Sequence, residues 1–363
     1  MKVTLIDKYL VKKFLGTFLF AILMIVSIAV VFDLSEKLDN FIEKQAPFKA
    51  IVFDYYLNFI PYFAVLFSSL FTFISVIYFT AKLAYNSEIT AMLSNGISIY
   101  RLLIPYMVAA FIIALSSFLV NNFILPHANR KRLDFEEVYY HGYRQNVTDI
   151  NIHRQVRPNI YIYMETYSTI SNLGRKFSME QFDDQGRLKS KLIADFARWD
   201  TTVNKWNVRN YYIRTIDDSL HEHIETGRRL DTTLYVTPDD FGRRENIVET
   251  MNLGELKRFV AEQRLQGADN IEVYEIALYN RYSNAFSAFI LTLIGFSLSV
   301  RRMKGGIGVQ IGFGIALSFA YIIFMQFSAQ FAIGGNINPL LASWIPNIIF
   351  SFVALGVFVI VPK

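Results

Sequence analysis

Cysteine is absent from the 363 residues of this chain, and charged residues are scarce. Without cysteine there is no disulfide framework, no thiol catalysis and no cysteine metal site. Asp, Glu, Lys and Arg make up 18% of the residues, whereas soluble proteins average about 25%. Hydrophobic residues make up 53%, and the mean hydropathy is +0.29. The composition therefore indicates a chain that lies largely in a membrane.

Motifs for nucleotide, metal and nucleophilic chemistry are also missing. The sequence contains no G-x-x-x-x-G-K-[ST], no G-x-S-x-G and no H-E-x-x-H. His221 and His223 are close together, but two ligands fall short of the three or four that a zinc site needs. We therefore expect a non-catalytic chain with no metal and no cofactor. The net charge of +5 does not indicate a nucleic-acid partner, because basic residues gather in loops beside the membrane.

Six apolar stretches are long enough to cross a bilayer, whose hydrocarbon core of about 30 Å needs about 20 residues in a helix. They run over 14–32, 51–80, 99–125, 282–300, 307–331 and 340–361. The second stretch is long and contains Pro61, so we expect tilt or a kink there. The six spans form two groups of three, separated by roughly 155 residues, which is enough for a domain.

Basic residues gather in the short loops on one side of these spans. They are Lys2, Lys8, Lys12 and Lys13 before the first span, Lys82 and Arg101 between the second and third, Arg301, Arg302 and Lys304 after the fourth, and Lys363. Cytoplasmic loops carry such an excess of Lys and Arg. We therefore expect both termini in the cytoplasm and the long segment between the third and fourth spans outside.

The long outer segment is predicted to be an all-β domain with helical connections. NIYIYMETYSTI alternates between two faces, and two further strands flank the turn Asp184-Gln185-Gly186. KWNVRNYYIRTI and TTLYVTP continue the pattern. Short strands at this spacing are typical of a sandwich or barrel. We therefore divide the chain into 1–125 with three spans, 126–270 with the β domain, and 271–363 with the other three spans.

The stretch YNSEITAMLSNG lies between the second and third spans and predicts a short helix at 86–96. Ser87 can cap its start and Gly96 can end it. Two spans can be joined by any polar turn, so a helix at this position indicates a surface that a partner contacts.

Two interpretations of Glu88, in the first turn of this helix, are open. In the first, its carboxylate only stabilises the helix N-terminus, by about 0.3–1 kcal/mol. In the second, the segment is a coupling helix. Ile89, Met92 and Leu93 form an apolar strip at i, i+3 and i+4 spacing that would occupy a groove of a cytoplasmic partner. Glu88 would then pair with an Arg or Lys of that partner.

With these motifs the chain resembles the LptF/LptG permeases of the lipopolysaccharide-export ABC transporter. The resemblance rests on NSEITAMLSNGIS, on LYNRYSNAFSAFILTLIGFSLSVRR, on LASWIPNIIF, and on a domain inserted between two groups of three spans. It implies a heterodimer of paralogous permeases in the bacterial inner membrane above a dimeric cytoplasmic ABC ATPase. Lipopolysaccharide would enter laterally from the outer leaflet and pass through a periplasmic β-jellyroll domain to bridge proteins. Length and the lack of a cytoplasmic tail favour LptG over LptF.

The resemblance also implies two sets of site residues. The ATPase-coupling set is Ser87, Glu88, Ile89, Met92, Leu93 and Gly96. Cations at the outer end of the first span are expected to meet lipid A phosphates, and in DLSEKLDNFIEK the candidates are Lys37 and then Lys44. Their acidic neighbours weaken this match, and a solvated loop charge is the alternative interpretation.

A membrane sensor and a membrane-anchored enzyme are the other classes that fit an outer domain between spans. A sensor normally has a cytoplasmic output domain, and the predicted cytoplasmic loops are short. An enzyme needs convergent nucleophiles or acids, which the sequence does not place together. An ATPase that copurifies with the protein distinguishes the permease from both alternatives.

Overall fold

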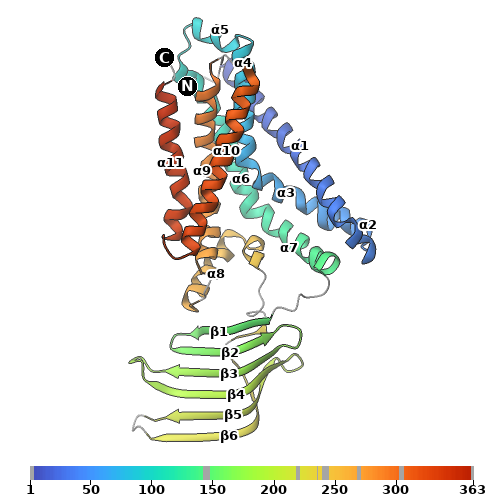
Figure 1. Cartoon of the computed structure of the whole chain (residues 1–363), viewed down its shortest axis with the longest axis vertical. Helices are drawn as coiled ribbons and strands as arrows, with labels where there is room; N and C mark the ends of the chain where they lie inside the picture. Colours follow the sequence, from blue (N-terminus) through green and yellow to red (C-terminus); the bar gives the residue numbers. More distant parts are fainter. Residues whose placement is uncertain are drawn as a thin grey trace. The chain divides into compact units, whose positions relative to one another are not determined.

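The computed structural model describes residues 4–141, 148–217, 221–234, 236–238, 245–267, 271–301 and 306–360. The chain divides into two compact units. The helical unit comprises Met1–Glu136, Glu249–Leu253 and Glu272–Lys363. The β unit comprises Glu137–Val248 and Gly254–Ile271. Figure 1 shows the elements of both along the chain.

Helices make up the helical unit, and most of the longer ones are apolar. They are α1 (Leu5–Glu43), α3 (Leu57–Leu66), α4 (Ser68–Tyr85), α6 (Ile99–Leu119), α7 (Leu125–Glu136), α9 (Ile271–Ser299), α10 (Gly306–Ile333) and α11 (Pro339–Ile360). Its shorter elements are α2 (Phe48–Ala50), the π-helices η1 (Ile51–Tyr56) and η2 (Val120–Ile124), and α5 (Glu88–Ser94). The π-helix η3 (Glu137–His141) and nearly all of α8 (Leu253–Leu265) belong to the β unit, and the residues of the 3-10 helix η5 (Glu245–Thr250) are divided between the two units. Among the described residues, six helices are long and apolar enough to cross a membrane, which confirms the predicted polytopic architecture.

The second predicted span is interrupted, but six residues after Pro61, where tilt or a kink was expected. It consists of η1, α3 and α4, and the helix is interrupted at Phe67, whose φ and ψ are −92° and 0°. Pro61 lies inside α3, six residues before the interruption. Ser68 and Ser69 follow the interruption directly, and paired serines are among the features at which helices kink. The Thr72 hydroxyl also donates to the Ser68 carbonyl at 2.7 Å, a bond that competes with the helix ladder.

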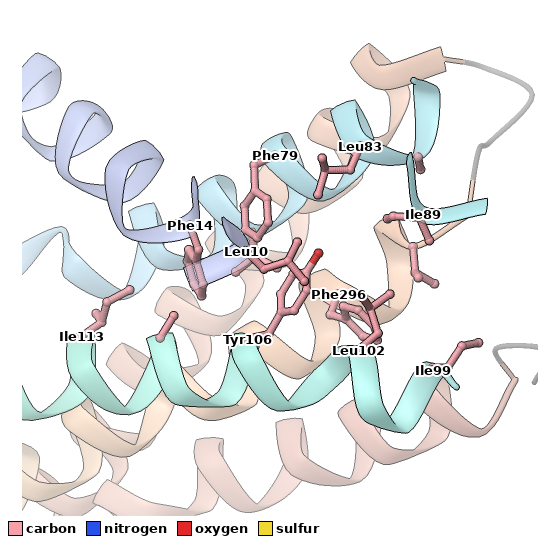
Figure 2. Close-up of a cluster of buried hydrophobic side chains, with 14 residues drawn as sticks. Leu10, Phe14, Phe79, Leu83, Ile89, Ile99, Leu102, Tyr106, Ile113 and Phe296 are labelled. Atoms are coloured by element: carbon pink, nitrogen blue, oxygen red, sulfur yellow. The ribbon is translucent and has the colours of Figure 1, made fainter. Parts of the chain in front are cut away.

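Aromatic rings form the centre of the helical core where α1, α4, α6 and α9 meet. Phe14 stacks on Phe79 with ring centroids 5.3 Å apart, and Phe79 stacks on Tyr106 at 5.1 Å. Phe296 meets the edge of Tyr106 at 4.7 Å. Figure 2 shows these side chains converging between the helices. Such pairs contribute about 0.5–1.5 kcal/mol each beyond the burial of their area, so this cluster fixes how α1 joins the bundle.

A second core cluster joins α4 to the last three spans. It contains Phe73 and Ile77 of α4 together with Leu291, Ile294, Tyr321 and Phe350. Three polar residues beside it are hydrogen-bonded to one another. The Tyr321 hydroxyl donates to Asn347 Oδ1 at 2.8 Å, and Asn347 Nδ2 donates to the Ser283 carbonyl at 2.9 Å. This pairing lowers the cost of placing these polar groups away from water.

The β unit contains one antiparallel sheet whose six strands follow the chain order (Figure 1). The strands are β1 (Thr148–Arg157), β2 (Ile160–Ser168), β3 (Leu173–Phe182), β4 (Leu188–Asp200), β5 (Lys205–Ile216) and β6 (Glu222–Thr232). The predicted all-β insertion is therefore confirmed. The described strands run up and down, whereas a jelly roll has Greek-key order in two sheets. Gly186, with φ of +77°, forms the predicted turn between β3 and β4.

One predicted strand is wrong. In TTLYVTP, the described residues after Thr232 belong to no strand. Leu234 and Val236 are instead buried against the face of the sheet that carries Trp206 and Phe177. The Trp206 indole N–H donates to the Val236 carbonyl at 2.7 Å. The segment crosses the apolar face of the sheet, so its alternating pattern reflects burial on the core and not pairing with a neighbouring strand.

The close contact of α9 with α4 generates a stability prediction. A Cβ added at Gly295 would lie 3.0 Å from Val76 Cγ1 and 3.1 Å from Phe73 Cδ2. Gly295→Leu is therefore expected to force the two helices apart and to destabilise the protein by about 1–3 kcal/mol. The measurement is the thermal unfolding midpoint in detergent. Gly356→Leu is the matched control, because nothing lies within 4 Å of the Cβ position at Gly356. Equal midpoints for the two variants would contradict the packing.

Candidate functional site

The helix α5 replaces a simple turn between α4 and α6, and its C-terminal end is formed as the sequence predicts. Gly96 has φ of +85° and its N–H donates to the Leu93 carbonyl at 3.0 Å. The N–H of Ile97 donates to the Met92 carbonyl at 3.2 Å. These two bonds are the Schellman motif, which ends a helix at a glycine.

The predicted cap at the start of α5 is wrong. Ser87 occupies the N-cap position, but its φ is +61° and its side chain makes no capping hydrogen bond. A capping serine normally has extended backbone angles, from which the hydroxyl reaches the N–H groups of the first turn. The left-handed backbone at Ser87 excludes that geometry. What Ser87 contributes is its carbonyl, which accepts from the Ala91 N–H at 2.9 Å.

The apolar strip of α5 is directed into the chain's own core. Ile89 is 1% exposed and belongs to the cluster of Phe14, Phe79 and Phe296 (Figure 2). Met92 and Leu93 are partly buried against the same cluster. The strip therefore anchors the helix to the bundle. The side chains that α5 leaves exposed are Thr90, Ala91 and Ser94.

Glu88 is held by α1 at the edge of this surface. The Tyr9 hydroxyl donates to Glu88 Oε2 at 2.8 Å, and Lys13 Nζ donates to the Tyr9 hydroxyl at 2.5 Å. Lys13 Nζ also lies 3.9 Å from Glu88 Oε1, and the two side chains are about one-third exposed. Asn86 Nδ2 approaches Oε1 at 3.5 Å. The carboxylate thus has a fixed position and still has access to a partner.

A second ionic contact fastens the same end of α1. Arg101 of α6 makes two parallel hydrogen bonds of 2.6 Å to the carboxylate of Asp7. Asp7 is also the third residue of a capping box with Thr4, which begins α1. Bidentate pairs of this kind are stronger and more directional than single contacts. The first turns of α1 are therefore bonded to the residues on both sides of α5.

Sequence reasoning missed Tyr9 and Lys13 as partners of Glu88, and it used Arg101 only to orient the spans. Tyr9 and Glu88 are separated by 79 residues, and Asp7 and Arg101 by 94. The signal that could have found them is the placement of Asp7, Tyr9 and Lys13 within two turns of one helix end. Such a set of polar groups beside an apolar span needs partners near the membrane surface.

At the opposite end of α1, Lys37 lies in a buried polar network. Its side chain is 12% exposed, and Nζ lies 3.0 Å from Asp33 Oδ1 and 3.0 Å from Glu136 Oε1. Nζ also donates to the hydroxyl of Tyr55, which is fully buried in η1. That hydroxyl lies 2.9 Å from Asp33 Oδ2. The network connects α1, η1 and α7, and it already surrounds the Lys37 ammonium with anionic oxygens.

Arg132 extends this network to the chain segment that returns from the β unit. Its guanidinium lies 3.7 Å from Glu136 and 3.6 Å from Glu249 of η5, and it covers the Tyr62 ring at 4.3 Å. Burial raises the pKa of the Glu249 carboxyl above its ordinary value, and the Arg132 cation opposes that rise. The Arg132 cation therefore favours the charged form of this carboxyl, while burial disfavours it.

Lys44, the second candidate, lies at the C-terminal end of α1. It is the C-cap residue of that helix, seven positions after Lys37, with a half-buried side chain. Nothing in the described contacts tests a lipid phosphate at either lysine, so both assignments stay predictions. Among the described residues, no group of three or more His, Asp or Glu side chains is arranged to hold a metal ion.

Comparison with known proteins assigns the chain to a family. A search of curated proteins finds no match. The family model of the lipopolysaccharide export system permease LptF/LptG matches residues 8–359, which is essentially the whole chain. That range includes all six candidate spans, α5 and the β unit. It covers both paralogues and does not choose between LptF and LptG. On this match, the chain belongs to the LptF/LptG family of lipopolysaccharide export permeases.

Proposed function

We propose that this chain is the permease subunit that extracts lipopolysaccharide from the inner membrane, while a separate cytoplasmic ABC ATPase supplies the energy. Family membership supports the substrate and the inner-membrane location. The observation that carries the coupling step is the fixation of α5. Ile89 anchors it in the helical core, and Tyr9 and Lys13 hold Glu88 at its start.

This fixation makes α5 a suitable element to transmit force. A partner that moves a freely mobile loop does no work on the spans, whereas a partner that moves α5 must also move the helices bonded to it. Glu88 provides an acidic contact for an Arg or Lys of the ATPase, and Thr90, Ala91 and Ser94 provide the surrounding surface. Tyr9 then passes a displacement of Glu88 directly to α1.

The basic residues at the end of the bundle that carries α5 support an orientation of the chain in the membrane. Lys8, Lys12 and Lys13 lie in the first turns of α1, and Lys82 lies in the last turn of α4, just before α5. Figure 1 shows these two helix ends near α5, and an excess of basic residues there is typical of a cytoplasmic face. The β unit is then periplasmic and passes the lipid to bridge proteins. Exposed phenylalanines on α10, such as Phe313, Phe319 and Phe327, supply an apolar surface for the paralogous permease or for lipid.

Lys37 and Lys44 are the proposed contacts for lipid A phosphates at the outer end of α1. Lys37 is paired with Asp33 and Glu136, so an incoming phosphate must replace a carboxylate as its partner. Such an exchange would loosen α1 from α7 as the lipid enters. Lys44 lies at the C-terminal end of α1 and would extend the same basic contact.

Glu88→Ala tests the coupling step. The variant is expected to lose about tenfold or more in affinity for the ATPase, because a hydrogen bond to a charged group contributes about 1.5–3 kcal/mol. The measurement is the amount of ATPase that copurifies with the detergent-solubilised permease, together with lipopolysaccharide release per ATP hydrolysed. Its thermal unfolding midpoint should change little, because Ile89 still anchors α5.

Glu165→Ala is the matched control, because it removes an ion-paired carboxylate from β2 of the β unit, and it should retain the ATPase. Full ATPase retention and normal lipid release in Glu88→Ala would refute the role of Glu88. If no ATPase copurifies with the unmodified protein, the sensor or enzyme class is favoured over the permease.

Lys37→Gln and Lys44→Gln test the lipid-phosphate contact. Both variants are expected to lower the stimulation of ATPase activity by lipopolysaccharide several-fold. Lys37→Gln should also lower the unfolding midpoint, because it leaves Asp33 and Glu136 without their cation, and losing one partner of a buried pair costs about 3–5 kcal/mol. Lys37→Arg, which keeps the charge, should preserve stimulation. Unchanged stimulation in both glutamine variants removes these lysines from the lipid site.

A further inference from the structure

One row of residues interrupts the regular alternation of the sheet in the β unit. In a regular strand, successive side chains point to opposite faces. Ala194 and Ala197 of β4 both belong to the apolar core. The two residues between them, Asp195 and Phe196, are both exposed and lie on the opposite, outward face. The left-handed backbone at Asn210, with φ of +51°, marks the same irregularity in β5.

This row concentrates positive charge on the outward face of β3 to β6. Six exposed cations lie there: Arg175, Lys176, Arg198, Arg209, Arg228 and Arg229. Phe196, which is 37% exposed, lies among them, and its Cα partners on the two neighbouring strands are Arg175 and Arg209. We call these six cations and Phe196 the basic face.

Most of the charge on the basic face is not neutralised within the described chain. Lys176 Nζ lies 2.7 Å from Glu165 Oε1, and Arg229 Nη2 lies 3.1 Å from Asp231 Oδ2. The other four cations have no carboxylate partner among the residues that the structure describes. The basic face therefore presents open guanidinium groups to an anion.

The pairing of strands adds a repulsive contact to this surface. Arg209 and Arg229 are Cα partners, directly opposite each other in β5 and β6. Like charges at such positions destabilise a sheet. Elsewhere on the outward face, Lys191 of β4 lies 2.7 Å from Glu180 of β3, as a stable pair should. A local rule broken without compensation inside the chain is typical of a functional surface, and an anionic ligand would supply the compensation.

The extent of the basic face limits what can bind there. It covers four strands and about four residues of each, which is roughly 19 Å by 14 Å, or about 270 Å². A stable protein–protein interface buries about 800 Å² on each partner, so this face is too small for a folded protein. A single phosphate or carboxylate is too small to span it. A narrow polymer with repeated anionic groups meets both limits.

The residue types point to carboxylates on a sugar backbone. Five of the six cations are arginines, whose planar guanidinium binds a carboxylate through two parallel hydrogen bonds. Phe196 offers a flat ring against which the C–H groups of a sugar ring can pack. Acyl chains do not suit this surface, because Arg175 and Arg209 flank that ring.

We propose that the basic face binds peptidoglycan, the carboxylate-bearing glycan of the bacterial cell wall. Carboxylates of its stem peptides pair with Arg175, Arg209 and Arg228, and a sugar ring packs on Phe196. The choice of this polymer rests on the proposed function, which puts the β unit in the periplasm. The contact tethers the transporter to the wall through the face of the sheet that lies opposite its apolar core.

The test is cosedimentation of the full chain in detergent, with whatever partners copurify, on purified peptidoglycan sacculi. The wild type is expected to bind, and binding should weaken as salt screens the exposed charges. Sacculi whose carboxyl groups have been amidated should bind far less. Combining Arg175→Gln with Arg209→Gln is expected to weaken binding about tenfold or more, because each change removes a charge-assisted contact.

A matched double variant controls for the loss of two positive charges. Lys191→Gln with Arg214→Gln changes the same outward face, but these two cations already pair with Glu180 and Glu222, so binding should be unchanged. Arg209→Gln alone should not lower the unfolding midpoint, because it removes the repulsion of Arg229. Weaker binding without loss of stability distinguishes a ligand contact from a structural role.

Three results would overturn the proposal. They are equal binding by the wild type and the Arg175→Gln, Arg209→Gln variant, undiminished binding to amidated sacculi, and displacement of the sacculi by lipopolysaccharide micelles or by an acidic protein. Failure of this proposal and failure of the proposed function are distinguishable. ATPase retention without binding to sacculi removes only the glycan site, and binding to sacculi without ATPase retention removes only the coupling role.

Discussion

The attachment of α1 to the rest of the helical unit is the constraint on which the other features depend. At one end, Asp7 and Tyr9 bond α1 to Arg101 and Glu88, and Phe14 inserts into the aromatic cluster. At the other end, Lys37 pairs with Glu136. Between these contacts, Leu19, Phe20, Leu23 and Met24 stay exposed. A helix that is fastened at both ends and exposed in the middle can respond to movement at either end.

The lysines at the two ends of α1 have different partners. This difference decides which of them can bind a ligand without losing an internal contact. Lys37 is enclosed by carboxylates and a tyrosine hydroxyl, so any anion must compete with internal partners. Such a network rigidifies the C-terminal ends of α1 and α7 while it is complete. At the α5 end, Asp7 is fully engaged by Arg101, and Lys12 has no such partner among the described residues. The same helix therefore carries one closed and one open cationic position.

The β unit is held together mainly by pairing between strands that are neighbours in the chain. Its strands pair in chain order, so each is positioned by a short turn from its neighbour. The sheet has an apolar face centred on Trp206, Tyr167 and Phe177, and that face is closed in part by a segment with no ladder bonds of its own. This explains why alternation in the sequence predicted a strand at TTLYVTP, where the structure has none after Thr232. Successive side chains of an extended segment that crosses a core point alternately to core and solvent, whether or not the segment pairs with a strand.

The sequence by itself determined the six spans, the position of the all-β insertion and the end of α5 at Gly96, because hydropathy, strand alternation and glycine at positive φ are local properties. It also carried the family resemblance. The tertiary structure decided which groups meet. Ile89 is buried in the bundle instead of facing outward, Glu88 bonds to Tyr9 79 residues away, and Lys37 bonds to Glu136 99 residues away. These contacts depend on how helices distant in the chain pack against one another, and no periodicity within a single segment records that packing.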